Sequence, residues 1–389
     1  MNIAVFTDVF FPERGGTEFA TYYLCKALIN SGHKIMLFCP DYHTEQSFDE
    51  FPVFRVRSIK ISDCDMISLV TLDKGRIFKA AKEFSPDIVY FCTGSGMAKA
   101  ALRVAKKLKI PAAATIHTKY KEAFYYSTHS KFIARCATDA LARRLNKADK
   151  VLTVSHDMAR QLKSYGCKNE ITVIRNGINK VNLPVEIPVE KPEIAGRHVN
   201  FMYCGHLIEA KNIHFTLKSL GYLKRERGFE NFTFNIVGKG DYEKKLKEVV
   251  KKENLEKNVV FKGFIKDRTE LNSIYGATDL FLFPSTFDTD GLVICEAAQM
   301  GAPTVTLKNY GASERITDNE TGFLADYDLK KFAERIYGII NDPELFAHVC
   351  KNVVSLHGEP WIEVAKKYEK VFEKMNFSRR ITMKAFFLD

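Results

Sequence analysis

The chain has 389 residues and a formal net charge of +11, and 46% of its residues are hydrophobic. This length is more than one hydrophobic core commonly supports, so we expect two domains. The composition is typical of a globular protein, and the apolar runs are too short to cross a bilayer, which excludes the class of proteins with membrane-spanning helices. The nine cysteines lack C-x-x-C pairs and zinc spacing, so neither a disulfide framework nor a zinc site is predicted.

The cysteines and the first residues of the chain also indicate a cellular compartment. Cysteines in apolar sequence surroundings are expected to stay reduced, which favours the cytoplasm. Residues 1–6 have the pattern of a strand and lack a basic region before an apolar stretch, so no signal peptide is expected.

Strands and helices are expected to alternate through the first half of the chain. Apolar runs predict strands, and amphipathic stretches predict helices. The expected strands are 3–6, 33–39, 53–56, 85–91, 112–116, 148–155 and 171–179, and the expected helices are 17–30, 75–84 and 97–108. This alternation indicates α/β architecture with a parallel, doubly wound sheet.

Two features of this half are candidates for ligand contact. Gly15 and Gly16 precede the helix at 17–30, where glycines let the backbone approach a ligand; the alternative is a tight turn. His117 follows the strand at 112–116, and ligands of open α/β sheets bind at the carboxyl ends of strands. The alternative for His117 is a cap on the next helix.

Residues 99–150, the basic segment, contain thirteen Lys and Arg but three Asp and Glu. Almost the whole net charge of the chain therefore lies here, and aromatic residues such as Tyr125, Tyr126 and Phe132 alternate with the basic ones. This pattern fits a helix at an anionic lipid surface. It also fits single-stranded nucleic acid, and a solvated face over an ordinary core is the third interpretation.

The second half follows a break in the pattern at 181–197, where prolines alternate with acidic residues and valine, as in a linker. Beyond it the alternation resumes. The expected strands are 198–204, 232–237, 259–261, 280–283 and 305–307, and the expected helices are 268–275, 292–300, 329–340, 343–353 and 361–374.

Residues 279–303 carry the strongest functional signal. A buried strand, a loop ending at Gly291 and a helix from Leu292 form an arrangement that binds anions, because the helix start offers free N–H groups. Asp288 and Glu296 flank these groups and repel phosphate, but they can accept hydrogen bonds from sugar hydroxyls. The combination suits a sugar nucleotide.

A rival interpretation uses the same loop. Asp288-Thr289-Asp290 has the form D-x-D, which binds metal ions in glycosyltransferases of the GT-A fold. The glycine and the helix that follow favour the phosphate loop instead.

Asp288-x7-Glu296, with Gly291-Leu-Val-Ile between, resembles the E-x7-E motif of retaining GT-B glycosyltransferases of family 4, whose first acid is usually Glu. Pro12-x-x-Gly15-Gly16-x-Glu18 and His117-Thr118 are also similar to that family. The resemblance implies two Rossmann-like domains that face a cleft. These are an acceptor-side domain at 1–180, a nucleotide-sugar domain at 198–360 after the linker, and a terminal helix with a tail at 361–389 that crosses back to the first domain.

The same resemblance implies roles for individual residues. His117 and Asp288 would hold the donor sugar, Lys211 would neutralise the leaving diphosphate, and these three are the catalytic candidates. His206 stands where the family has Arg, so a permanent charge is missing there. Donor-binding roles are implied for Gly15, Gly16, Gly205, His206, Gly238, Phe264, Ile265, Asp288, Gly291, Leu292, Val293 and Glu296.

The implied activity is transfer of a hexose, with retention and without a metal or cofactor, from a UDP- or GDP-sugar to a hydroxyl acceptor. The Tyr-rich run after His117 resembles diacylglycerol glucosyltransferases, so we expect a membrane lipid acceptor, peripheral location at the inner face of a membrane, no nucleic acid, and a monomer or homodimer. Alternatives are a polysaccharide or soluble acceptor, and a non-catalytic membrane-surface protein with a decayed site. A dinucleotide oxidoreductase would need G-x-G-x-x-G after the first strand.

Overall fold

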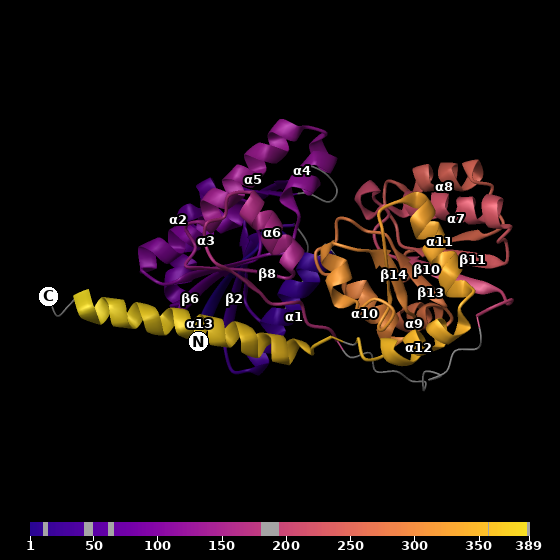
Figure 1. Ribbon diagram of the computed structural model, residues 1–389. Coiled ribbons are helices and arrows are strands. Elements are labelled where there is room, and N and C mark those ends of the chain that lie inside the picture. The colour runs from indigo at the N-terminus through magenta and orange to yellow at the C-terminus, as the bar shows by residue number, and fades with distance from the viewer. Residues whose placement is uncertain (11–14, 43–49, 61–65, 180–193, 357, 387–389) are drawn as a thin grey trace. The chain divides into compact units, whose positions relative to one another are not determined.

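The computed structural model describes residues 1–10, 15–42, 50–60, 66–179, 194–356 and 358–386 (Figure 1). Internal contacts divide the chain into two units. The first unit is Met1–Asn179 with Glu359–Asp389, and the second unit is Lys180–Gly358. Most of the expected linker, 181–193, and the last residues of the expected tail, 387–389, lie outside the described residues.

The first unit contains a seven-stranded sheet in which all neighbouring strands are parallel. Across the sheet the strands are β3 (Val53–Val56), β2 (Lys34–Pro40), β1 (Asn2–Phe6), β6 (Ile88–Phe91), β7 (Ala112–Ile116), β8 (Lys150–Thr153) and β9 (Ile171–Val173). A separate antiparallel pair consists of β4 (Ser58–Lys60) and β5 (Met66–Ser68). The strand order reverses between β1 and β6, which is where open α/β sheets bind ligands.

Helices cover both faces of this sheet (Figure 1). Along β1, Ile3 and Val5 join the core on one face, whereas Ala4 and Phe6 join the core on the other. A strand buried on both faces must be apolar throughout, which explains the unbroken apolar runs in the sequence. The helices are α1 (Gly16–Asn30), α2 (Val70–Phe84), α3 (Gly96–Leu108), α4 (Tyr120–Thr128), α5 (Lys131–Leu145), α6 (His156–Ser164) and α13 (Trp361–Phe386).

Two helix bounds differ from the sequence-based prediction. Helix α2 begins at Val70 rather than at Gly75, because Val70 is buried and starts the apolar stripe that continues through Ile77 and Ala81. Helix α13 ends at Phe386 rather than near Lys374, because the residues beyond Lys374 include no Gly or Pro that would stop a helix. Its first turns pack on α1, with Val364, Tyr368 and other residues buried in the core of the first unit.

The second unit contains a six-stranded parallel sheet. Across it the strands are β12 (Val259–Gly263), β11 (Phe232–Val237), β10 (Val199–Cys204), β13 (Leu280–Phe283), β14 (Thr304–Leu307) and β15 (Phe323–Ala325). The order reverses between β10 and β13. The loops that follow these strands therefore share one edge of the sheet at its switch point. The prediction of two doubly wound parallel α/β sheets is confirmed.

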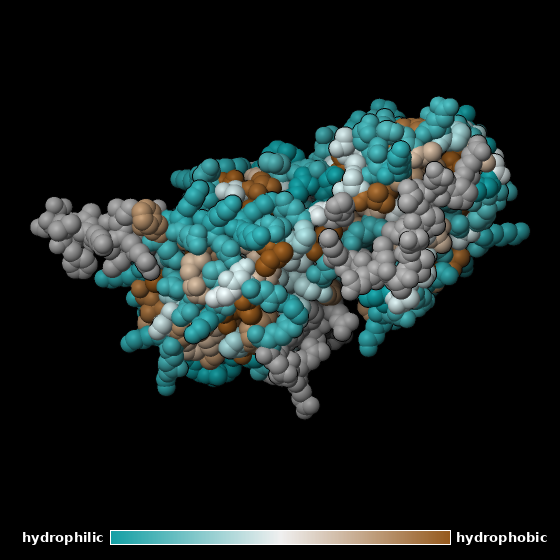
Figure 2. Space-filling model, turned by 90° about the horizontal axis from the view of Figure 1, so that it is seen from below, coloured by the Kyte–Doolittle hydropathy of each residue, from teal (hydrophilic) through white to brown (hydrophobic). Residues whose placement is uncertain are grey.

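Four helices of the second unit agree with the predicted ones to within one residue: α9 (Arg268–Gly276), α10 (Leu292–Gln299), α11 (Leu329–Ile340) and α12 (Pro343–Val353). The sequence analysis did not predict α7 (Ile213–Arg227), α8 (Glu243–Lys252), η1 (Glu209–Lys211) and η2 (Gly311–Arg315). No helix among the described residues is long and apolar enough to span a bilayer. The face in Figure 2 is mainly hydrophilic, with hydrophobic residues in small separate areas.

Candidate functional site

The loop between β13 and α10 is shaped by its own backbone contacts. The buried Ser285 hydroxyl accepts hydrogen bonds from the N–H groups of Phe287 and Asp288, at 3.3 and 3.2 Å. Gly291, with φ +66°, immediately precedes α10, and an added Cβ there would lie 2.9 Å from Ala312 Cβ. This position therefore favours glycine on two grounds, backbone conformation and space. The loop presents Asp288 on the same edge as the start of α10.

Lys211 and Asp288 meet across this edge. Lys211 ends η1 after β10, and its Nζ lies 2.5 Å from Asp288 Oδ1. The second carboxylate oxygen of Asp288 is buried and has no hydrogen-bond partner among the described residues. Asn212 Nδ2 donates to the carbonyl of Pro284 at 3.3 Å and so fixes the two loops to each other. The structure thus brings together two of the three predicted catalytic residues.

Glu296 lies on α10, one turn beyond Leu292 and Val293. Arg268 Nη2 is 3.3 Å from Glu296 Oε1, and the buried hydroxyl of Tyr275 donates to Oε2 at 3.4 Å. Both partners lie on α9 and fix the position of the Glu296 carboxylate. The sequence-based prediction assigned Glu296 but did not find these two partners.

His206 follows β10 and is exposed. Partial loss of hydration lowers the pKa of its ring, and the charge of Lys211 lowers it further, although Asp288 opposes both. His206 is therefore neutral near pH 7 in the ligand-free protein. The electrostatics of the free protein therefore disfavour a protonated His206 as the replacement for the charge of the family's Arg.

The glycine loops after β10 and β11 contact each other through their backbones. An added Cβ at Gly238 would lie 1.9 Å from the carbonyl oxygen of Gly205, and one at Gly240 would lie 2.3 Å from that of Leu207. Gly205 N–H in turn donates to Val237 O at 3.0 Å. Another loop of the chain therefore leaves no room for a side chain at Gly238, and the predicted contact of Gly238 with the donor stays a prediction.

Phe264 and Ile265 follow β12 at the same edge. The Phe264 side chain is 55% exposed, which leaves its ring available for a contact. The N–H of Gly238 donates to Gly263 O at 2.8 Å, so the loops after β10, β11 and β12 form one continuous rim.

Asp290 does not behave as the second acid of a D-x-D metal motif. It is 4% exposed, and its Oδ1 lies 2.8 Å from Nη2 of the equally buried Arg315. A metal ion would have to replace this ion pair. The described residues also contain no group of three or more His, Cys, Asp or Glu that could hold a metal ion.

The remaining predicted residues belong to the first unit. Gly15 precedes α1, and an added Cβ there would lie 2.6 Å from Glu18 Oε2, because the buried Glu18 side chain folds back over it. Burial raises the pKa of Glu18, although backbone hydrogen bonds at Gly15 and Glu18 oppose this. At Gly16 an added Cβ would meet no described residue within 4 Å.

His117 directly follows β7 and is half-buried. Two residues on, Lys119 is 1% exposed and pairs with Asp157 at 2.8 Å. The assignment of Lys119 to a surface-facing basic segment is therefore wrong, because a nearby acid lets its charge be buried. This ion pair ties the segment after β7 to the start of α6.

Asp8 was missed by the sequence analysis. It follows β1 at the switch point, and its carboxylate accepts from Thr93 Oγ1 at 2.6 Å, Met97 N–H at 2.8 Å and Ser95 N–H at 3.0 Å. Burial raises its pKa despite these bonds. An acid two residues after an apolar strand was a signal in the sequence that could have identified it.

A further network joins α4 and α5 to the loop after β6. Gly94 N–H donates to the Tyr120 hydroxyl at 2.5 Å, and Arg144 donates to Gly94 O at 2.6 Å. Burial raises the pKa of Tyr120 to about 12.

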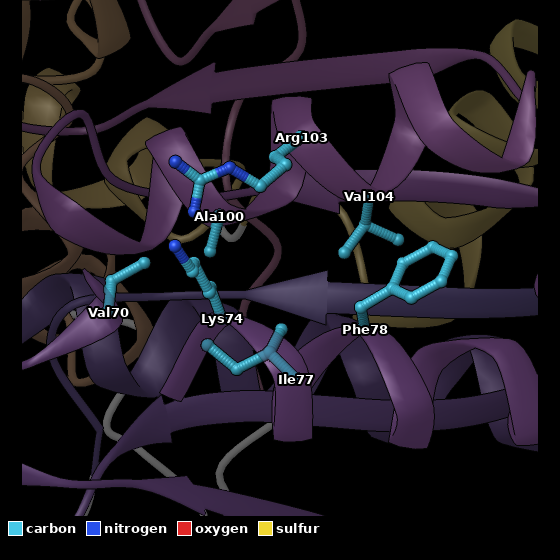
Figure 3. A pocket seen from close by; sticks show the side chains of 7 residues that line it. All are labelled: Val70, Lys74, Ile77, Phe78, Ala100, Arg103 and Val104. Atoms are coloured by element: carbon cyan, nitrogen blue, oxygen red, sulfur yellow. The ribbon is translucent and has the colours of Figure 1, made fainter. Parts of the chain in front are cut away.

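A shallow groove lies between α2 and α3 (Figure 3), and none of the predicted site residues lines it.

Comparisons with known proteins agree with this geometry. Residues 14–181 match the family described as Glycosyltransferase Family 4, and residues 188–353 match the one described as Glycosyl transferases group 1. The chain is a glycosyltransferase. It uses a nucleotide-sugar donor.

Among curated relatives of this glycosyltransferase are two named alpha-monoglucosyldiacylglycerol synthase. The one from Streptococcus pneumoniae is 24% identical over 85% of this chain and 76% of its own. The one from Acholeplasma laidlawii is 24% identical over 90% and 91%.

The fold is shared with solved structures. HepE from Anabaena, solved in complex with UDP, is 19% identical and covers 96% of this chain and 100% of its own, with a TM-score of 0.75. Sucrose-phosphate synthase from Thermosynechococcus elongatus is 17% identical and covers 97% and 99%, also with a TM-score of 0.75. Both likenesses confirm the two-sheet fold.

Proposed function

We propose that this glycosyltransferase transfers a hexose from a UDP-sugar to a hydroxyl group of a membrane lipid such as diacylglycerol. Retention of the anomeric configuration and independence from metal ions are parts of the proposal. The observation that carries it is the Lys211–Asp288 pair beside the start of α10, which sets one cation and one hydroxyl acceptor next to free helix N–H groups.

Catalysis by such a site depends on positioning and on charge stabilisation at the departing diphosphate. In this proposal Lys211 and the N–H groups of Leu292 and Val293 stabilise that charge. Asp288 accepts a hydrogen bond from the donor sugar through the carboxylate oxygen that has no partner among the described residues. Glu296 accepts from the ribose. Contact of His117 with the donor sugar stays a prediction.

The lipid acceptor is supported by the relatives named for diacylglycerol and by the surface of α4 and α5. Tyr125, Tyr126, Phe132 and Ile133 are exposed there, and Phe132 is 76% exposed. Basic residues such as Lys131 and Arg135 lie beside them in sequence. Exposed aromatic residues with cations suit a peripheral contact with an anionic bilayer.

The test is incubation with radiolabelled UDP-glucose, UDP-galactose and GDP-mannose, with diacylglycerol vesicles, with a soluble glucan, and without acceptor. The anomeric configuration of the product is read by NMR, and parallel reactions contain EDTA. Label in the lipid fraction, α-linked product and activity in EDTA support the proposal. Label in the glucan instead supports a polysaccharide acceptor, and vesicle binding without turnover of any donor supports the non-catalytic alternative.

A further inference from the structure

A buried ion pair lies directly behind the start of α10. Arg315 and Asp290 have side chains that are 5% and 4% exposed. Nη2 of Arg315 lies 2.8 Å from Asp290 Oδ1, and its Nε donates to the backbone carbonyl of the same residue at 2.8 Å. One guanidinium therefore holds both the side chain and the main chain of Asp290.

Such a pair is a poor means of stabilising a fold, because removing two charges from water costs about as much as their attraction returns. An apolar pair of similar volume commonly stabilises a protein at least as well. The position of the pair in the chain suggests another role.

Asp290 is the last residue before Gly291, which immediately precedes α10. Gly291 packs against Ala312, and Ala312 and Arg315 belong to the same short helix, η2. Helix η2 thus contacts two consecutive residues at the end of the loop. At the other end the Ser285 hydroxyl holds the N–H groups of Phe287 and Asp288, so Asp288 lies between two anchored points.

We propose that Arg315 is a positioning residue for the donor site. Through Asp290 it fixes the start of α10 and the carboxylate of Asp288 before the donor binds, so that little ordering is needed on binding. Arg315 acts through the loop, since it is buried and its guanidinium already contacts Asp290. The inference rests on the proposed function, in which the donor diphosphate binds at the start of α10.

The chemistry of the contact makes the role specific to arginine. The planar guanidinium offers Nε and Nη donors in fixed geometry, whereas lysine offers a single ammonium on a flexible stem. Arg315→Lys keeps the charge but cannot keep both contacts. Asp290→Asn keeps the backbone carbonyl and removes the charge of the side chain. The two variants therefore separate the main-chain contact from the ion pair.

The experiment measures the affinity for UDP by calorimetry, kcat and KM for the donor, and KM for the acceptor, with thermal unfolding of each variant. Arg315→Lys is expected to bind UDP about tenfold more weakly and to raise the donor KM, with acceptor KM unchanged. Asp290→Asn is expected to show a smaller effect in the same direction. The control is Arg335→Lys, which alters an Arg–Asp contact of 2.8 Å with Asp318 elsewhere in the second unit.

Wild-type UDP affinity and donor KM in Arg315→Lys would overturn the inference, and so would a lower melting temperature as its only effect. If Arg315→Lys does not fold, Asp290→Asn decides by the same criteria. If the wild-type protein binds neither UDP nor GDP, both the proposed function and this inference are wrong. If the wild-type protein binds UDP and the variants bind it equally well, only this inference is wrong.

Discussion

Lys211 and Asp288 form an ion pair of 2.5 Å that links the loops after β10 and β13. In the free protein the Asp288 carboxylate is thus paired with Lys211, the cation that the proposal assigns to the donor diphosphate. In the proposal the phosphates therefore compete with Asp288 Oδ1 for Lys211, whereas the other oxygen of this carboxylate accepts from the donor sugar. In the proposal, donor binding exchanges one set of charge contacts for another.

Replacing Lys211 tests this exchange. Lys211→Ala is expected to lower kcat by about 10²–10³, the usual effect of removing one preorganised group that stabilises developing charge. Steady-state transfer assays measure it, with circular dichroism to show that the fold persists. Lys308→Ala, which breaks an exposed pair with Asp326 in the same unit, is the control. Unchanged kcat in Lys211→Ala would exclude this residue from the mechanism.

Replacing Glu296 separates binding from chemistry. Glu296→Ala is expected to weaken UDP binding about tenfold or more, because a hydrogen bond to a charged acceptor contributes roughly 1.5–3 kcal/mol. Calorimetry with free UDP checks this. Glu243→Ala, which removes a half-buried partner of Lys247 on α8, should leave the affinity unchanged. Equal affinity of both variants would show that Glu296 does not contact the nucleotide.

The neutral state of His206 gives a pH prediction. Its pKa lies below the ordinary value of 6.5, so a positive charge at this position appears only as the pH falls below that value. His206→Arg is expected to bind UDP several-fold more tightly at pH 7.5, because it supplies a permanent charge. Titrations of both proteins and of His206→Gln at pH 5.5 and 7.5 check this. The Gln variant corrects for titration of UDP itself, and weaker binding by the Arg variant would contradict the prediction.

The same shift affects stability. A lowered pKa in the fold means that the unfolded state takes up protons first as the pH falls through 6.5, so the free energy of unfolding decreases below that pH. His214 contributes in the same direction, because burial lowers its pKa too. Urea unfolding at pH 5.5 and 7.5 measures the slope, which should be smaller in His206→Gln. An equal slope would show that His206 titrates normally in the folded state.

The buried pair of Lys119 and Asp157 predicts a large loss of stability. Lys119→Met leaves a carboxylate that is 10% exposed without its main cation, which typically costs about 3–5 kcal/mol. The double variant with Asp157→Leu should recover much of this loss, because it removes the stranded charge as well. Denaturant midpoints of the first unit measure both, and a single variant as stable as the wild type would contradict the prediction.

The exposed residues of α5 test the membrane contact. Phe132→Ser with Ile133→Ser is expected to lower the fraction of protein that floats with anionic vesicles, because less apolar area can enter the interface. Flotation at low and high salt measures the effect. Val354→Ser removes an exposed apolar residue of the second unit and is the control. Equal flotation of all variants would place the contact elsewhere.

The strands were predictable because their apolar runs, such as Leu280–Phe283, are buried on both faces. Long-range ion pairs could not be predicted from the sequence. Nothing near Asp290 in the sequence indicates a partner as distant as Arg315, and Lys119 is indistinguishable from the surface cations that follow it. Glu296 was assigned to the donor site because its spacing from Asp288 is local, and this assignment stays a prediction. Its partners on α9 were missed, because contacts between separate elements leave no periodic pattern.

The polypeptide leaves the first unit at Asn179 and re-enters it at Glu359. Trp361 then packs so closely on Gly177 that an added Cβ there would lie 2.7 Å from its ring. During synthesis the ribosome must translate the whole of the second unit and pass Glu359 before the first unit can complete its core, whereas the second unit then already has all its own strands. A stop codon ahead of α13 would therefore damage the part of the molecule that was translated first.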